Sequence, residues 1–228
     1  MKRLRVLVTA GPTYEYIDPI RIITNPSSGK MGIAIAREAY KRGTLVTLVY
    51  GPGTEIPPSY LKVKNVKTTA QMHDVVIREL KTKYYDIVIA AAACADFTPL
   101  KPSAQKIRTE KNRKVTITLK PTPKIIDSIK KVSPKTFLVA FKAEYNRKKK
   151  ELIEIALKRL KSSKADLIVV NDVAKPGAGF EADKNEVFVI DPKRNITHIP
   201  MAQKSIIAAK ILDLVLIKLK SLSKRGEA

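Results

Sequence analysis

The sequence has little of several residue types, and each shortage excludes a class of protein. Its 228 residues include one cysteine, Cys94, so no disulfide can form within the chain, which fits a reducing, cytoplasmic compartment. The two histidines, His73 and His198, are far apart and no cysteines cluster, which argues against a zinc site. No apolar run reaches the roughly 18 residues that a membrane-spanning helix needs. We therefore expect a soluble globular protein with no bound metal of its own and no membrane span.

Acidic residues are scarce relative to basic ones. The chain has 44 lysines and arginines against 21 aspartates and glutamates, which gives a formal charge of +23. Such an excess suggests nucleic acid, an anionic membrane or a polyanionic small molecule as partner. The basic residues are spread along the chain, however, and aromatic side chains, on which unpaired bases stack, make up only 6% of it. A basic nucleic-acid-binding protein is therefore an alternative, which steep salt dependence of binding to random DNA would support.

Apolar runs rich in β-branched residues alternate with amphipathic helical segments along the chain. The basic N-terminus before the apolar residues 4–9 superficially resembles a signal peptide, but this run is short and ends in a Gly-Pro turn, so it predicts a first strand. Further strands are predicted at 45–50, 63–69, 86–93, 137–141 and 166–170, and helices at 29–42, 70–82, 123–131, 147–161 and 201–219.

The remaining segments complete a single domain spanning residues 1–228. Residues 187–190 and 196–199 predict an antiparallel pair, residues 115–119 alternate like a strand, and the tail at about 220–228 is polar and expected to fray. The polar, basic stretch at about 99–114 predicts a mobile flap. The predicted fold class is α/β, a doubly wound, Rossmann-like parallel sheet with an antiparallel edge and an inserted flap.

The stretch NPSSGKMG, residues 25–32, stands where the first helix begins, after an unusually long connection at 10–28. Ser27 or Ser28 can cap the helix, and Gly29 and Gly32 let an anion approach its free N–H groups. This pattern favours a phosphate-binding helix start. The alternative is an ordinary capped helix in a surface turn.

Glycine spacing also bears on dinucleotide binding. A common dinucleotide site needs G-x-G-x-x-G directly after the first strand, where this chain has T-A-G-P-T, and its G-x-x-G follows about 18 residues later. This placement argues against an NAD(P)-dependent oxidoreductase, which stays open as a second alternative on the same fold class. A change in NADH fluorescence on mixing would support it.

Several polar residues are candidates for chemistry. Asn25 could donate to an oxygen that gains negative charge, or could simply form a turn before a proline. Arg21 could clamp a carboxylate or phosphate, or lie on the surface. Asp18 is better explained as a turn residue, whereas Asp96 could accept from a base amino group, hold a metal or form an Asx turn. Cys94 has no histidine near it in sequence, so a buried structural thiol is favoured over a nucleophile.

Seven motifs together carry a specific resemblance. In chain order they read GPTYEYIDPIR, ITNPSSGKMG, AAACADF, KIR, FKAE, DLIVVND and GFEADKNEV. They resemble the phosphopantothenoylcysteine synthetases, ligases of coenzyme A biosynthesis, over roughly residues 4–219.

The resemblance implies a two-step amide synthesis. The carboxylate of 4′-phosphopantothenate attacks the α-phosphorus of CTP and releases pyrophosphate, and the amine of L-cysteine then attacks the acyl-cytidylate and releases CMP. It further implies Mg²⁺ on the triphosphate, a homodimer in which the antiparallel region takes part, and CTP rather than the ATP of eukaryotic relatives. Many relatives carry an N-terminal decarboxylase domain, which does not precede Met1, so a stand-alone synthetase or a fragment is expected.

The resemblance also implies roles for individual residues. Asn25 would stabilise the acyl-cytidylate, with Arg21 beside it on the substrate, and Lys106 of the flap would engage the triphosphate and close over the intermediate. Nucleotide contacts are implied for Ser28, Gly29 and Gly32 in the phosphate-binding turn, for Ala90, Ala91, Ala92 and Asp96 at a strand end, and for Pro123, Phe141, Lys161 and Lys164.

Three segments depart from the family pattern. The flap reads Lys106-Ile107-Arg108-Thr109 instead of K-I-K-K, so two basic positions remain. The usual K-N-P-D-I is replaced by residues 120–125, KPTPKI, which puts the backbone contacts there in doubt. Before DLIVVND the basic residues do not align with two nucleotide-contacting lysines, so Lys161 and Lys164 are assigned by proximity alone.

Overall fold

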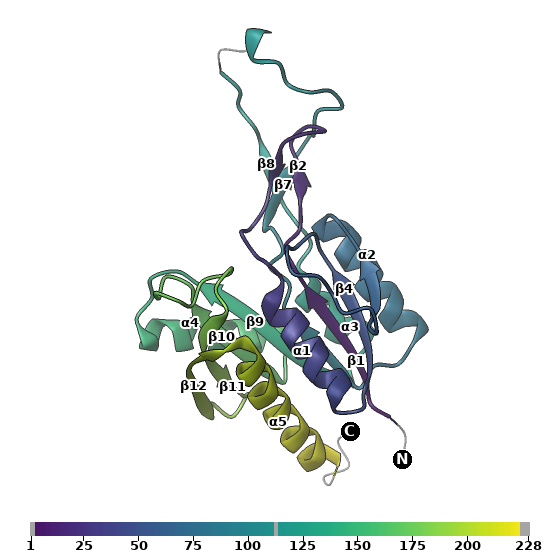
Figure 1. Cartoon of the computed structure of the whole chain (residues 1–228), viewed down its shortest axis with the longest axis vertical. Helices are drawn as coiled ribbons and strands as arrows, with labels where there is room; N and C mark the ends of the chain where they lie inside the picture. Colours follow the sequence, from purple (N-terminus) through teal and green to yellow (C-terminus); the bar gives the residue numbers. More distant parts are fainter. Residues whose placement is uncertain (1–2, 112–113, 224–228) are drawn as a thin grey trace.

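The computed structural model describes residues 3–111 and 114–223 and contains one mainly parallel sheet, whose strands spread across the view of Figure 1 behind α1 and α5. The strand order across the sheet is β12-β11-β10-β9-β6-β1-β4-β5. Six of these strands are parallel, and β11 and β12 form the antiparallel edge. The strands are β1 (Arg5–Ala10), β4 (Leu45–Tyr50), β5 (Lys62–Asn65), β6 (Ile87–Ala90), β9 (Phe137–Glu144), β10 (Leu167–Asp172), β11 (Lys184–Ile190) and β12 (Ile196–Gln203). The predicted fold class is confirmed.

Helices cover both faces of the sheet because the central strands are apolar on both sides. In β1, Val6 and Val8 contribute to one core, whereas Leu7 contributes to the other. One face is covered by α1 (Lys30–Lys41) and α5 (Lys204–Ser223), which pack against each other. The opposite face is covered by α2 (Thr69–Thr82), α3 (Ile125–Val132) and α4 (Lys149–Ser163). None of the helices within the described residues is long and apolar enough to cross a membrane.

Some element boundaries differ from the sequence predictions. β12 pairs with β11 as far as Gln203, so the last helix begins at Lys204 and not at residue 201. This helix continues to Ser223, into the segment predicted to fray, and residues 224–228 lie outside the described part of the chain. The strand predicted at 63–69 ends at Asn65, because Thr68 already caps α2 by accepting from the N–H of Gln71.

The long connection before α1 contains a hairpin of β2 (Glu15–Tyr16) and β3 (Ile22–Ile23). Asp18 lies in its turn and accepts from the backbone N–H of Arg21 at 2.7 Å, which confirms Asp18 as a turn residue. Burial opposes ionisation of this carboxyl group, but backbone N–H groups and Arg21 outweigh it and hold its pKa well below the usual range. Asp18 also accepts from the N–H of Ile107 at 3.2 Å, which ties the hairpin to the flap.

The flap extends away from the sheet at the carboxyl ends of the parallel strands (Figure 1). Its base is the antiparallel pair β7 (Phe97–Pro99) and β8 (Leu119–Pro121), and a 3₁₀ turn at Thr109–Lys111 lies near its tip. The strand predicted at 115–119 is therefore wrong except at its last residue. Residues 112–113 of the predicted flap lie outside the described residues.

A buried carboxylate, Glu79, holds together a group of polar side chains beneath α2. Glu79 is 2% exposed and lies 2.6 Å from Lys64, 3.0 Å from Lys83 and 2.5 Å from the hydroxyl of Tyr85. Burial alone would raise the pKa of Glu79, but the hydrogen bonds from these three side chains lower it to about 2. None of the four residues lines the cavity described below.

Candidate functional site

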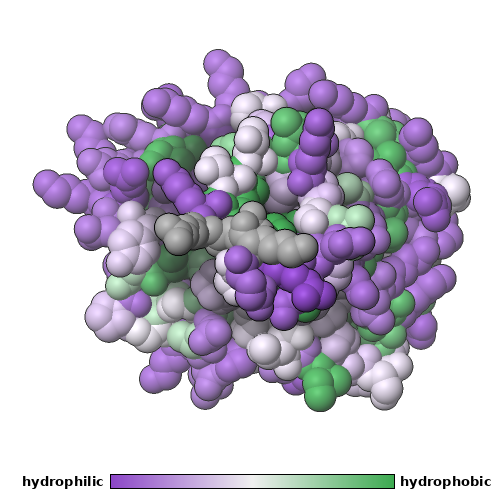
Figure 2. All heavy atoms as spheres, turned by 90° about the horizontal axis from the view of Figure 1, so that it is seen from above, coloured by the Kyte–Doolittle hydropathy of each residue, from purple (hydrophilic) through white to green (hydrophobic). Residues whose placement is uncertain are grey.

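A cavity of about 560 Å³ opens at the carboxyl edge of the sheet. Strand order reverses between β1 and β6, the topological switch point at which α/β sheets bind ligands. The cavity lies there and is lined by residues 29–32 at the start of α1, residues 90–96 after β6, residues 122–126 before and in α3, and residues 141–143 of β9. Figure 2 looks onto this end of the molecule and shows hydrophilic side chains projecting around most of the outline of the molecule.

The start of α1 is shaped by two glycines. Gly29 is the N-cap, with φ +85°, and a Cβ there would meet the hydroxyl of Tyr50 at 2.8 Å. A Cβ on Gly32 would lie 2.3 Å from Cβ of Ala10. Because neither glycine has a side chain, the start of α1 can lie directly against Tyr50 of β4 and Ala10 of β1. The first N–H groups of the helix are then next to the cavity. The N-cap residue is Gly29 and not a serine, but the predicted serine hydroxyls do accept from backbone N–H groups at the helix start: Ser27 from Gly29 and Ser28 from Lys30, each at 3.4 Å.

Ser28 also holds a loop that borders the cavity. Its hydroxyl donates to the carbonyl of Phe180 at 3.0 Å, and Lys204 donates to the same carbonyl at 3.1 Å. Lys30 pairs with Asp183 of this loop at 2.6 Å. Of these five residues, Lys30, Lys204 and Phe180 line the cavity, whereas Ser28 is buried behind it.

Asn25 lies beside the end of β6. It lines the cavity, and its side-chain amide donates to the carbonyls of Ala93 at 3.2 Å and Cys94 at 3.0 Å, just beyond the end of β6. An amide nitrogen has two hydrogens, so donation to a substrate oxygen requires one of these bonds to be exchanged. Asn25 thus holds the strand end in place and is positioned to exchange partners.

The side of the cavity next to α3 and α4 is also basic. Lys124 pairs with Asp96, Arg159 lies 3.0 Å from Asp127, and Lys142 lies 2.9 Å from the carboxylate at the end of β9. All three cations line the cavity. Basic groups therefore flank the strand ends on both faces of the sheet, with Lys30 and Lys204 on the α1–α5 side.

Most of the predicted site residues come together. The cavity is lined by Asn25, Gly29, Gly32, Ala90, Ala91, Ala92, Asp96, Pro123 and Phe141. Phe141 packs against the core on the α1–α5 side, whereas Pro123 precedes α3 on the other side. The predicted nucleotide contacts are thus divided between the two faces.

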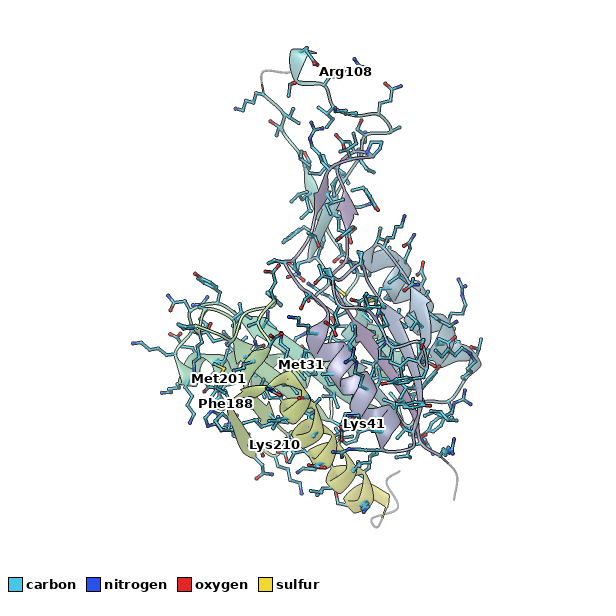
Figure 3. All side chains as sticks on the ribbon, viewed as in Figure 1. Met31, Lys41, Arg108, Phe188, Met201 and Lys210 are labelled. Carbon is cyan, nitrogen blue, oxygen red and sulfur yellow. The ribbon has the colours of Figure 1, made fainter. Side chains whose placement is uncertain are left out.

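The other predicted residues lie away from the cavity lining. Arg21 pairs with Asp18 at 2.5 Å at the base of the flap, and Lys106 is exposed on the flap itself, whose far end carries Arg108 in Figure 3. Lys161 and Lys164 are exposed at the end of α4.

Sequence reasoning missed the cations that do line the cavity. In α4 the buried positions are 152, 156, 160 and 163, and Arg159 lies beside this inward stripe whereas Lys161 does not. The helical period could therefore have selected Arg159. Lys30, Lys124, Lys142 and Lys204 carry no comparable local signal.

Cys94 is partly exposed and lines the cavity, so the predicted burial of this thiol is only partial. Burial, followed by the charges of Asp96 and Glu15, raises the pKa of Cys94 to about 12. Its sulfur lies 3.6 Å from the sulfur of Met72 in the core beneath α2. A thiol with this pKa is a poor nucleophile at neutral pH, as predicted.

Metal-ligating groups do not gather in the described part of the chain, which contains no group of three histidine, cysteine or acidic residues able to hold an ion. Asp96 is the one carboxylate among the described residues that line the cavity, and it is paired with Lys124. A divalent ion would therefore have to arrive with most of its ligands on another molecule.

Comparison with known proteins gives consistent matches. A family model described as the DNA/pantothenate metabolism flavoprotein C-terminal domain matches residues 1–218. The chain is 44% identical over 187 residues to the Coenzyme A biosynthesis bifunctional protein CoaBC of Thermococcus kodakarensis, covering 82% of this chain and 44% of that protein. It is 36% identical over 214 residues to the protein of the same name from Methanocaldococcus jannaschii, covering 92% and 51%.

The fold agrees with these matches. The crystal structure of the C-terminal domain of a Coenzyme A biosynthesis bifunctional protein CoaBC is 32% identical and superposes with a TM-score of 0.79, covering 97% of this chain and 98% of that one. The chain spans about half the length of the curated relatives that it matches.

Proposed function

Because the chain belongs to the family of DNA/pantothenate metabolism flavoprotein C-terminal domains, we propose that it is a phosphopantothenate–cysteine ligase of coenzyme A biosynthesis. The observation that supports this proposal best is the cavity at the switch point, with basic side chains on both faces of the sheet. Such a site suits two anions that must meet over the strand ends. A phosphorylated carboxylic acid and a nucleoside triphosphate are two such anions.

The proposed reaction has two steps. A carboxylate oxygen of 4′-phosphopantothenate bonds to the α-phosphorus of CTP, and the bond to the leaving pyrophosphate breaks. The cysteine amine then bonds to the acyl carbon, the carbon–oxygen bond to CMP breaks, and the amine loses its proton to solvent. Preorganised cations and amides assist both steps by stabilising the charge that develops on phosphate and acyl oxygens.

Different residues of the chain have different roles in these two steps. Asn25 exchanges one of its carbonyl partners for the acyl-cytidylate, while the small side chains of Ala90–Ala92 let the nucleotide approach the backbone. Lys106 reaches the site only when the flap bends over the cavity, and Arg21 only when the β2–β3 hairpin, to which the flap is hydrogen-bonded at Ile107, moves with it. Such closure would exclude water from an intermediate that hydrolyses easily.

Magnesium belongs to the substrate in this proposal. The lining offers one paired carboxylate, so a cation would keep water and triphosphate oxygens as its main ligands, as Mg²⁺ prefers. The metal–nucleotide complex would then bind as one unit against the basic lining.

The test measures pyrophosphate release with 4′-phosphopantothenate, L-cysteine and Mg²⁺, with CTP or ATP, for the wild type, Asn25→Ala and Asn65→Ala. Asn65 is an exposed asparagine at the end of β5 and serves as the matched control. We expect turnover with CTP, a loss of about 10²–10³-fold in Asn25→Ala, and no change in Asn65→Ala.

Omitting cysteine separates the two steps. The wild type should then release about one pyrophosphate per site in a burst, and Asn25→Ala should not accumulate the acyl-cytidylate. Turnover with ATP alone would keep the ligase and refute CTP as the nucleotide. Folded wild-type protein that releases no pyrophosphate with either nucleotide would refute the proposed function.

Two partners complete the proposal. We infer a homodimer, because β12 leaves an antiparallel sheet edge on which Ile196 and Met201 are exposed. Light scattering during gel filtration tests this, and a monomer at assay concentration would refute it. A decarboxylase, fused or separate, would use the product, in keeping with the bifunctional names of the relatives.

A further inference from the structure

Lys204 combines burial, charge and access to the cavity in a way that no other lysine of the site does. It is the first residue of α5, is only 6% exposed and lines the cavity. In the part of the chain that the structure describes, no carboxylate lies within ion-pair distance of its ammonium group. Because buried charges in proteins are normally paired, this cation lacks a partner that a ligand could supply.

The groups around Lys204 leave its charge largely uncompensated. One of its hydrogens bonds to the carbonyl of Phe180 at 3.1 Å. The charged groups that face it are Lys30 from α1, Asp183 from the loop before β11 and Glu55 from the loop after β4. Asp183 is already paired with Lys30 at 2.6 Å. Burial, followed by the charge of Lys30, lowers the pKa of Lys204 to about 8, so that it is still mostly protonated at pH 7.

The position of Lys204 adds a second source of positive potential. α1 and α5 pack side by side, and Gly29, Met31 and Gly32 at the start of α1 line the cavity together with Lys204. The first N–H groups of α1 have no acceptor within the helix and carry partial positive charge. In Figure 3, Met31 marks this end of α1, and Lys41 lies at the opposite end.

We propose that Lys204 binds the phosphate monoester of the pantothenate substrate, together with the N–H groups at the start of α1, which gives this turn to the pantothenate phosphate and not to the nucleotide that the family resemblance implied there. This inference rests on the proposed function and deepens it. In 4′-phosphopantothenate the phosphate and the reacting carboxylate are at opposite ends, so the phosphate must be held away from the bond that forms. One unpaired buried cation and a helix start match a compact dianion.

The experiment measures binding of one ligand at a time by calorimetry, so that turnover is not needed. The wild type, Lys204→Met and Lys210→Met are titrated with 4′-phosphopantothenate, with pantothenate and, in a separate series, with CTP alone. Lys210 is an exposed lysine of the same helix, labelled in Figure 3, so its replacement removes the same charge away from the cavity. We expect Lys204→Met to weaken binding of the phosphorylated ligand by about 10–100-fold and to leave pantothenate unchanged, and Lys210→Met to change neither.

The pH dependence gives an independent readout. A phosphate monoester stays dianionic above pH 7, because its second pKa is about 6. If the protonated amine is the binding form, the dissociation constant of 4′-phosphopantothenate should rise about 10-fold between pH 7 and pH 9 in the wild type. Lys204→Met should lose this dependence. The wild-type titration decides the matter even if Lys204→Met does not fold.

Three outcomes would overturn the inference. Equal weakening of both ligands would mean that Lys204 only positions the loop through Phe180. Weakened binding of CTP with unchanged binding of 4′-phosphopantothenate would assign Lys204 to the nucleotide. A flat wild-type pH profile would show that its proton does not matter. By contrast, phosphate discrimination that depends on Lys204 without any ligase turnover would refute the proposed function and leave this inference standing.

Discussion

Replacing Gly32 by alanine should damage activity far more than stability. The new Cβ would lie 2.3 Å from Cβ of Ala10 and 3.2 Å from the carbonyl oxygen of Thr9, neither of which can rotate away. Carbon atoms in contact prefer about 3.5–4.0 Å, so the start of α1 must move by about 1.2–1.7 Å. Overpacking of this kind costs about 1–3 kcal/mol. The better helix propensity of alanine offsets about 1 kcal/mol, which leaves a net loss of about 0–2 kcal/mol.

Activity should suffer more, because the displaced segment carries the N–H groups and Met31 that line the cavity. A misplacement of about 1 Å can cost about 100-fold in rate, so we expect kcat/KM for pyrophosphate release to fall by at least that factor. Thermal unfolding monitors stability in parallel.

The matched control is Gly43→Ala, at the other end of α1. Gly43 has φ +78° and open space around it, so alanine there is strained by about 1–2 kcal/mol without touching the site. Gly43→Ala should lower the unfolding temperature and leave kcat/KM unchanged. Wild-type kcat/KM in a folded Gly32→Ala variant would refute the reasoning.

Three further predictions follow from named contacts. Glu79→Gln should lower the free energy of unfolding at pH 7 by about 3 kcal/mol, since the pKa of Glu79 is about 2 in the fold against 4.5 ordinarily. Because this pKa is lowered, the stabilisation is present above pH 4.5 and disappears towards pH 2, where the urea unfolding curves of variant and wild type should converge. Parallel pH profiles of the two proteins would contradict the assignment. Cys94 should resist alkylation at pH 8 in the native protein and react once unfolded, because its pKa is about 12; rapid stoichiometric labelling of folded protein would disprove this. Arg159→Met should raise KM for the nucleotide by about 10–100-fold, because Arg159 lines the cavity. The control Lys158→Met, on the exposed side of α4, should leave KM unchanged. Equal KM values in the two variants would show that Arg159 does not bind the nucleotide.

Local patterns predict the parallel part of the fold because each central strand is a continuous apolar run. The run at 45–50 matches β4 to the residue, and the helix predicted from 29 begins at Lys30. β12 could not be delimited in this way. Met201 and Gln203 suit a helix locally, but pairing with β11 keeps them in a strand, and that pairing depends on residues far away in sequence. The strands β2 and β3 pair locally, but with two residues each they are too short for a hydrophobic pattern to reveal.

The same difference between local sequence patterns and long-range contacts decides which residues of the site were predictable. Gly29, Gly32 and the alanines at the end of β6 were predictable as cavity-lining residues, because small side chains at a helix start and a strand end permit close approach. For the two glycines the structure adds a second reason, since Tyr50 and Ala10 leave no room for a side chain. The motif resemblance built on them is confirmed by the family match. Cations were not predictable, since a chain with 44 lysines and arginines offers too many candidates. Lys204 and Lys210 occur in one helix and differ only in burial, which sequence does not report.

The high net charge therefore does not by itself make the site. On the α3–α4 side each cation of the cavity already has a carboxylate partner, so an incoming anion exchanges partners there. Partly exposed pairs of this kind are worth about 0–1 kcal/mol, which makes the exchange cheap and the gain small. Lys204 has no pair to give up, and the cost of burying its charge is offset only when an anion arrives. Binding energy should therefore concentrate at the α1–α5 end, where salt screens it least, whereas the paired cations at the α3–α4 end should contribute more to ligand orientation than to affinity.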